Sequence, residues 1–139
     1  MEIIIHLNIL AMIKLKFLKR KNPNDLTAPE KYYAAAVSEG SINLNRLAEK
    51  IAYQSTLTPG DCYNVLSALE KNIIEELNDG RIVRLGELGT FRLSVSSEGS
   101  DTLENTHSGM VKKARILFRP AKGLRKMLRN LDFRKVQAA

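Results

Sequence analysis

The side chains of this 139-residue chain that could do chemistry are mostly basic, and they gather in two groups. Residues 14–21 carry five lysines and arginines and no acid, and residues 112–135 carry ten against one acid, Asp132. The stretch between the two groups has seven basic and thirteen acidic residues. This asymmetry favours a polyanionic partner, which would be a nucleic acid, an anionic membrane or an acidic protein.

The spacing of several basic residues is that of a strand with one basic face. Residues 90–96 alternate, with Phe91, Leu93 and Val95 on one side and Arg92 on the other. Residues 111–119 also alternate, and place Ile116 and Phe118 opposite three cations, Lys113, Arg115 and Arg119. Because successive strand residues point to opposite faces, the cations should share the face away from the core. This face is either a solvated sheet surface or a surface that contacts phosphates.

The other reactive side chains do not form a recognisable catalytic or metal site. His6 and His107 lie far apart and have no companion ligands, and no Ser, His and Asp are spaced as a triad. Gly86 and Gly89 fit a turn or bulge rather than a phosphate-binding loop. The single cysteine, Cys62, lies on an apolar stripe and should be buried. We therefore expect no enzyme activity, no cofactor, no metal and no small-molecule substrate.

An N-terminal strand pair should precede the main body. Residues 13–19 alternate as a strand, residues 21–29 have turn composition with two prolines, and residues 32–37 are a second strand candidate. These features predict a β-hairpin within an extension of residues 1–40. The lysines and arginines of residues 14–21 either enlarge a binding footprint or protect a strand edge from aggregation.

Two helices should follow. Asn43 is a plausible N-cap of the first, and Thr58, followed by Pro59 and Asp61, is the expected cap of the second. The second helix should end at residues 78–80. Its apolar stripe is broad, and is made of Cys62, Tyr63, Val65, Leu66, Leu69, Ile73, Ile74 and Leu77. A helix of this kind has more apolar surface than one neighbouring helix can cover, which indicates that a partner subunit covers the rest.

Three strands and a helix should complete the chain. We expect strands at residues 81–85, 90–96 and 111–119, with a polar and mobile segment at residues 97–108. Pro120 should open the last helix, whose apolar positions would be Leu124, Met127, Leu128 and Leu131.

This order of elements resembles the bacterial histone-like HU/IHF family, and three motifs carry the resemblance. They are Leu47-Ala-Glu-Lys-Ile-Ala52 with Thr58 and Asp61; Gly80-Arg-Ile-Val-Arg-Leu85 with Leu88-Gly-Thr-Phe91; and Phe118-Arg-Pro-Ala-Lys122. The resemblance covers about residues 42–131. It implies an α+β, IHF-like fold in residues 41–139: two helices, a three-stranded antiparallel sheet with a long β-arm, and a C-terminal helix.

The resemblance also implies a non-enzymatic, intertwined homodimer that binds double-stranded DNA in the bacterial cytoplasm, at the nucleoid, with low sequence specificity and without a membrane. The extra N-terminal strands resemble those of extended HU-like variants. The implied DNA-binding residues are Arg84, Arg92, Lys112, Lys113, Arg115, Arg119 and Lys122. Only Lys122 is expected to reach DNA from the last helix, whose other cations, Arg125, Lys126 and Arg129, should be solvated.

The sequence departs from the family at its arm. The Arg-Asn-Pro motif, whose proline wedges between base steps, is absent, since residues 94–113 contain no proline. Glu98, Asp101 and Glu104 occupy the outer arm, where acids would repel phosphates. Glu87 and Ala121 also replace family glycines. We therefore expect a weaker or different bend, or a protein-interaction module that has kept the fold and lost DNA bending.

The first residues leave two further questions open. Residues 1–13 are apolar but too short to span a bilayer, and they lack the features of a signal peptide. Met12 is a second candidate start codon, so residues 1–11 either belong to the working fold or do not. An anionic-membrane binder is the remaining alternative, supported only by this apolar segment and the basic ends.

Overall fold

A computed structural model describes residues 12–136, and these residues form two units that each contain a three-stranded sheet. The first unit combines the N-terminal residues up to Ser41 with the residues from Leu128 onward, and the second spans Ile42–Met127. The apolar segment of residues 1–11, with His6 and the question of a second start, lies outside the described residues.

The first unit contains the expected N-terminal hairpin and one strand that the sequence did not predict. Strands β1 (Ile13–Arg20) and β2 (Lys31–Ala36) pair antiparallel, from Leu15 opposite Ala36 to Arg20 opposite Lys31, which confirms the hairpin. Strand β6 (Phe133–Lys135) runs parallel to the start of β1. A three-residue strand has no periodicity to recognise, and its partner lies more than a hundred residues earlier in the chain.

Two capped helices open the second unit, as expected. In α2 (Leu44–Gln54) the Asn43 side chain accepts a hydrogen bond from the Arg46 N–H at 2.9 Å. In α3 (Pro59–Asn78) the Thr58 hydroxyl oxygen accepts one from the Asp61 N–H at 3.2 Å. The Thr58 hydroxyl and N–H both donate back to the Asp61 carboxylate, at 2.6 and 3.3 Å. Because these bonds favour the charged carboxylate, they lower the pKa of Asp61 below its usual value.

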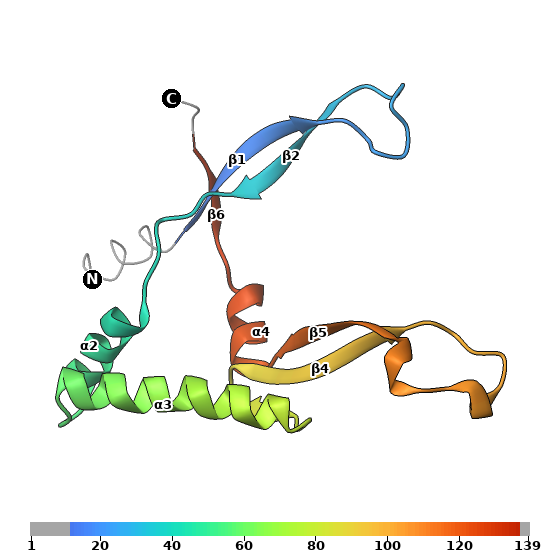
Figure 1. Ribbon diagram of the computed structural model, residues 1–139. Coiled ribbons are helices and arrows are strands. Elements are labelled where there is room, and N and C mark those ends of the chain that lie inside the picture. The colour runs from blue at the N-terminus through green and yellow to red at the C-terminus, as the bar shows by residue number, and fades with distance from the viewer. Residues whose placement is uncertain (1–11, 137–139) are drawn as a thin grey trace. The chain divides into compact units, whose positions relative to one another are not determined.

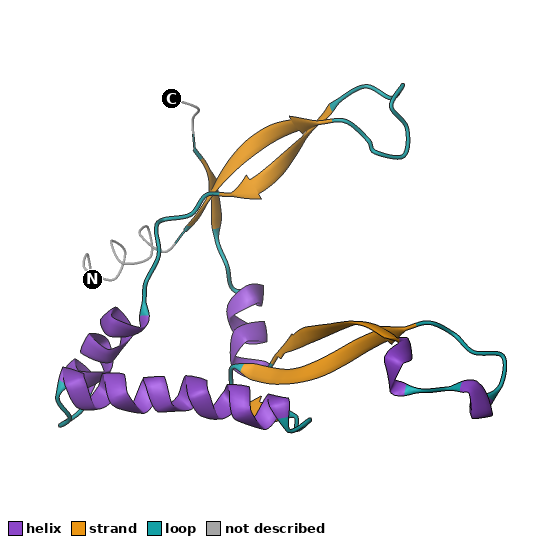
Figure 2. Ribbon diagram, viewed as in Figure 1, coloured by secondary structure: helices purple, strands orange, loops and turns teal. Residues whose placement is uncertain are grey.

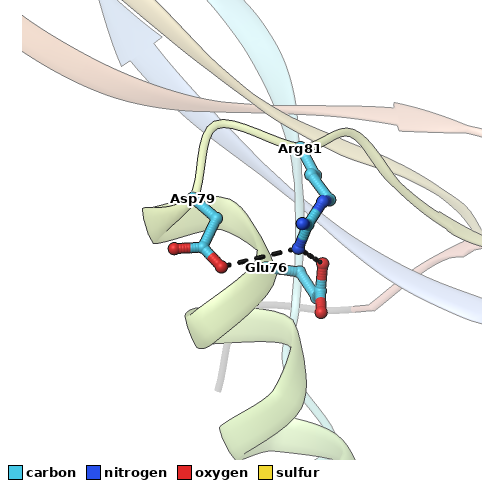
Figure 3. Close-up of polar contacts among 3 residues, drawn as sticks. All are labelled: Glu76, Asp79 and Arg81. Atoms are coloured by element: carbon cyan, nitrogen blue, oxygen red, sulfur yellow. Dashed lines mark hydrogen bonds and ion pairs between the residues drawn. The ribbon is translucent and has the colours of Figure 1, made fainter.

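The end of α3 is held by an arginine (Figure 3). The Arg81 guanidinium lies 2.6 Å from a Glu76 carboxylate oxygen and 3.4 Å from one of Asp79. The Arg81 N–H also donates to the Glu76 carbonyl at 3.0 Å. Gly80, at φ 79°, lets the chain reverse here at little cost. Arg81 is therefore engaged at the helix end.

The second sheet has the order β3-β4-β5 and extends into a two-stranded ribbon (Figures 1 and 2). Strand β3 (Val83–Leu85) pairs only with the beginning of β4 (Gly89–Ser97), across a turn in which Gly86 has φ 51°. Strand β5 (Val111–Pro120) pairs with the whole of β4. Two short 3₁₀ turns, η1 (Leu103–Asn105) and η2 (Ser108–Met110), lie in the connection between β4 and β5, for which the sequence predicts a polar and mobile segment.

The last helix, α4 (Lys122–Arg129), is shorter than predicted. Pro120 is the final residue of β5, opposite Gly89, and does not open the helix. The Ala121 N–H still donates to the Leu88 carbonyl, at 2.8 Å, so the helix begins only at the following residue. Leu131 lies beyond the helix, because the chain there turns into β6.

Few apolar side chains are buried. In the described part of the chain only Ala48, Cys62 and Leu77 are, at 1%, 2% and 8% exposure, which confirms the prediction for Cys62. On α3, Val65 and Ile74 remain 62% and 67% exposed. No helix within residues 12–136 combines the length and apolar character needed to cross a bilayer.

Candidate nucleic-acid interface

Five basic side chains share one face of the second sheet. Directly paired strand residues point to the same side. Thr90 is paired with both Arg84 and Arg119, and the neighbouring pairs that point the same way are Arg92 with Leu117, Ser94 with Arg115 and Ser96 with Lys113. We call Arg84, Arg92, Lys113, Arg115 and Arg119 the basic sheet face. Strand parity had predicted this arrangement for all except Arg84.

The opposite face of the sheet is apolar, and the packing of its side chains fixes the β4–β5 register. This register determines which face each basic residue points to. Phe91 pairs with Phe118, and their ring centroids lie 4.9 Å apart. The Phe118 ring lies directly over Gly89, where an added Cβ would approach the ring and the Arg119 carbonyl oxygen to 2.5 Å. A residue larger than glycine would push β4 and β5 apart. Since a shift by one residue would move every cation to the other face, this packing is what positions the basic sheet face.

Three arginines of the basic sheet face surround a shallow depression of about 430 Å³. Its lining includes Arg84, Arg92 and Arg119, with Thr90 and Leu117 between them. A guanidinium presents a planar fork of donors that matches a phosphate or carboxylate. The ion pairs found within residues 12–136 involve none of the five cations of the basic sheet face. Their charges are thus not neutralised by acids among the described residues.

Two of the seven predicted site residues lie elsewhere. Lys112 falls where the β4–β5 register shifts, and its ammonium lies 3.2 Å from a carboxylate oxygen of Glu98. This acidic partner reduces the positive charge that Lys112 can offer a phosphate. Lys122 is the first residue of α4, next to the turn between β3 and β4. That turn approaches closely, because a Cβ on Gly123 would come within 2.8 Å of the Glu87 carbonyl oxygen.

The predicted site residues did not include the neutral residues of the basic sheet face. Leu117 lies between the predicted cations Arg115 and Arg119 on the same strand and faces the same way. The hydroxyl residues Thr90, Ser94 and Ser96 share this face. Strand parity alone would have identified all four. Hydroxyl groups can donate to phosphates, and a leucine can contact sugars, so the surface suits a nucleic-acid backbone.

The outer part of the ribbon differs in charge from its base. Glu98, Asp101 and Glu104 lie between the end of β4 and η2, and all three are exposed. Within residues 12–136, no three His, Cys, Asp or Glu side chains come together as metal ligands. Residues 98–110 contain no lysine or arginine, so the positive surface of the ribbon is confined to its paired strands.

Comparison with known proteins relates this chain to a family. Residues 12–135 match the HU-HIG family, described as an HU domain fused to a wHTH, Ig or glycine-rich motif. Comparison of the sequence with curated proteins gives no match.

Solved structures also match, among them the following two. The first is a candidate DNA-binding protein from Bacteroides vulgatus, with a TM-score of 0.64 and 11% identity over 90% of this chain. This chain spans 48% of that protein's length, and the likeness supports the fold alone. The second is an Anabaena HU–DNA cocrystal structure, with a TM-score of 0.49 and 25% identity over 64% of this chain and 99% of the other. Since the family match extends over nearly the whole described chain, this α+β protein belongs to the HU-HIG family and is HU-like.

Proposed function

We propose that this protein is an architectural DNA-binding protein that holds duplex DNA against its basic sheet face. The observation that carries this proposal is the set of five cations, none paired with an acid in the described chain, aligned on one side of β3, β4 and β5. Cations on a sheet face contact phosphates and carry little sequence information, so the binding has low sequence specificity. We expect the protein to act at the bacterial nucleoid and to have no catalytic activity.

The proposed working form is a homodimer. A single chain leaves much of α3 uncovered, including Val65, Leu69 and Ile74. With three buried apolar side chains in the described residues, the chain has much less core than its length would allow. A second copy packed on α3 would remove this surface from water. Replacing Val65 and Ile74 with Glu should therefore convert the dimer to an unfolded or monomeric chain, which sedimentation equilibrium would measure.

The direct test is a gel-shift series with duplexes of unrelated sequence at several salt concentrations. The proposal predicts similar affinities for all sequences and a steep loss of binding as salt rises, because each phosphate contact releases about one counterion. Absence of binding at low salt would refute the proposal. A strong preference for one sequence would refute the low specificity while leaving the DNA-binding face in place.

The acidic outer ribbon motivates a second candidate, a protein-interaction module with the same fold. Glu98, Asp101 and Glu104 would repel phosphate, and the absence of proline removes the wedge that kinks DNA. Reversing the charges of Arg115 and Arg119 with Glu discriminates the two functions. If cellular partners and phenotype stay unchanged in R115E/R119E, DNA is not the target.

A further inference from the structure

The sheet of the first unit has two unlike faces, and one of them is basic. In the register of β2, β1 and β6, Lys14 is paired with Arg134 and Arg20 with Lys31. Lys16 lies between these pairs on the same side, since strand residues alternate. We call Lys14, Lys16, Arg20, Lys31 and Arg134 the second basic face. Arg134 joins it only through β6, which the sequence did not predict.

The two remaining cations of this sheet point to the other side and are already engaged. That side carries the aromatic residues Phe17, Tyr32 and Phe133. The Lys19 ammonium there lies 3.0 Å from a Glu30 carboxylate oxygen, and the Lys135 ammonium lies 5.4 Å from the centre of the Phe17 ring. Both cations on this side therefore have a partner within the sheet unit, whereas on the second basic face only Lys14 is in an ion pair, with Glu39.

The second basic face has the charge and length to follow a nucleic-acid backbone. Lys14 is paired with Glu39 at 2.6 Å, whereas Lys16, Arg20, Lys31 and Arg134 form no ion pair within the described residues. From Lys14 to Arg20 the strand extends about 20 Å. Duplex DNA covers that distance in about six base pairs, with a phosphate on each strand at every step.

We propose that the second basic face is a further binding site for the phosphate backbone of duplex DNA. Tyr33, 48% exposed and on the same side, adds a hydroxyl that can donate to a phosphate. An anionic membrane would attract the same cations, so the vesicle measurement below distinguishes lipid from DNA as the ligand. The inference deepens the proposed function and rests on it for the class of ligand.

The two faces of this sheet supply a matched pair of variants. K16Q/R134Q removes two cations from the second basic face, and K19Q/K135Q removes two from the opposite face, with the same change in net charge. The affinities of both double variants, made in the full chain, are measured by fluorescence anisotropy. The titrations use a labelled 30-base-pair duplex at salt concentrations from 0.05 to 0.2 M. Two lost phosphate contacts should weaken binding about 60-fold per bound chain at 0.1 M and lower the salt slope by about 1.8.

The control K19Q/K135Q should bind within about twofold of the unmodified protein, and the charge-preserving variant K16R/R134K should keep most of the affinity. If K16Q/R134Q and K19Q/K135Q lose affinity equally, or neither does, the second site is refuted. If K16Q/R134Q keeps its DNA affinity but no longer sediments with phosphatidylserine vesicles, the face binds lipid and the inference is wrong.

The same assay separates this site from the proposed function. If R92Q/R119Q loses affinity and K16Q/R134Q does not, the basic sheet face stands and the second site fails. If only K16Q/R134Q loses affinity, the second site stands and the proposed role of the basic sheet face fails. If the unmodified protein does not bind DNA at 0.05 M salt, both are wrong.

Discussion

Replacing Arg92 and Arg119 with glutamine removes two of the five charges of the basic sheet face and keeps side chains of similar length. Both residues line the depression near β3 and form no ion pair with the described acids, so the substitution leaves no acid unpaired there. Each phosphate contact contributes a slope of about 0.9 in log K against log salt. The five contacts of this face contribute about 4.5 to the slope per chain, which alone gives a loss of roughly 500-fold between 0.05 and 0.2 M salt.

With three contacts left on this face, its contribution to the slope should fall to about 2.7 per chain, so the total slope should drop by about 1.8 and affinity at 0.1 M should be about 60-fold lower. In a homodimer both slopes double. The gap between the two proteins should narrow as salt rises, which distinguishes lost charge contacts from a damaged fold.

Anisotropy titrations of a duplex at four salt concentrations measure both quantities. The matched control is K50Q/K71Q, which removes two exposed cations from α2 and α3 and should leave the slope unchanged. Equal slopes for R92Q/R119Q and the unmodified protein would refute the assignment of this face to phosphates. A similar loss in K50Q/K71Q would show that net charge matters and that its position does not.

Three further predictions concern stability and the ribbon. Gly89→Ala should destabilise the fold by about 1–3 kcal/mol because its Cβ overlaps the Phe118 ring, whereas Gly99→Ala, with no atom within 4 Å, should not; thermal melts compare the two. Thr58→Ala should cost about 1 kcal/mol by removing the N-cap. The pKa of Asp61 is lowered by its bonds with Thr58, so the charged carboxylate stabilises the fold at pH values above its usual pKa of 3.8. This stabilisation is lost as the pH falls through the folded-state pKa. The difference in unfolding free energy between Thr58→Ala and the unmodified protein should therefore shrink in acid, which urea melts at several pH values test. A circular-permutation assay should find a small bend, because residues 97–110 offer no proline wedge, and a bend as large as that of a proline-bearing arm would contradict this reasoning.

Local rules made most of the elements predictable from the sequence. The caps at Asn43 and Thr58, the turn at Gly86 and the alternation around Arg92 each depend on residues close in the chain. The match of Arg92 with Arg115 and Arg119 followed from the same alternation, because the period of a strand is two. For the same reason, the neutral positions between those cations could have been included.

The structure departs from the expectation of simple local patterns where distant segments meet. Pro120 is a good first residue of a helix by composition, yet the Ala121 bond to Leu88 keeps it in β5. Lys112 matches its basic neighbours in the sequence, but a register shift places it beside Glu98. A shift of this kind depends on how two strands pair and is not visible in either strand alone.

The sequence by itself determined that the protein has an HU-like order of helices and strands, two basic groups and an arm without proline. Only the tertiary structure decided which charges are available and which act together. Side chains from residues 84, 92 and 119 meet because antiparallel pairing brings them to one side, and Arg134 joins Lys14 through a three-residue parallel strand. Charge composition is a property of the chain, but a binding face requires the strand register, and tertiary packing sets that register.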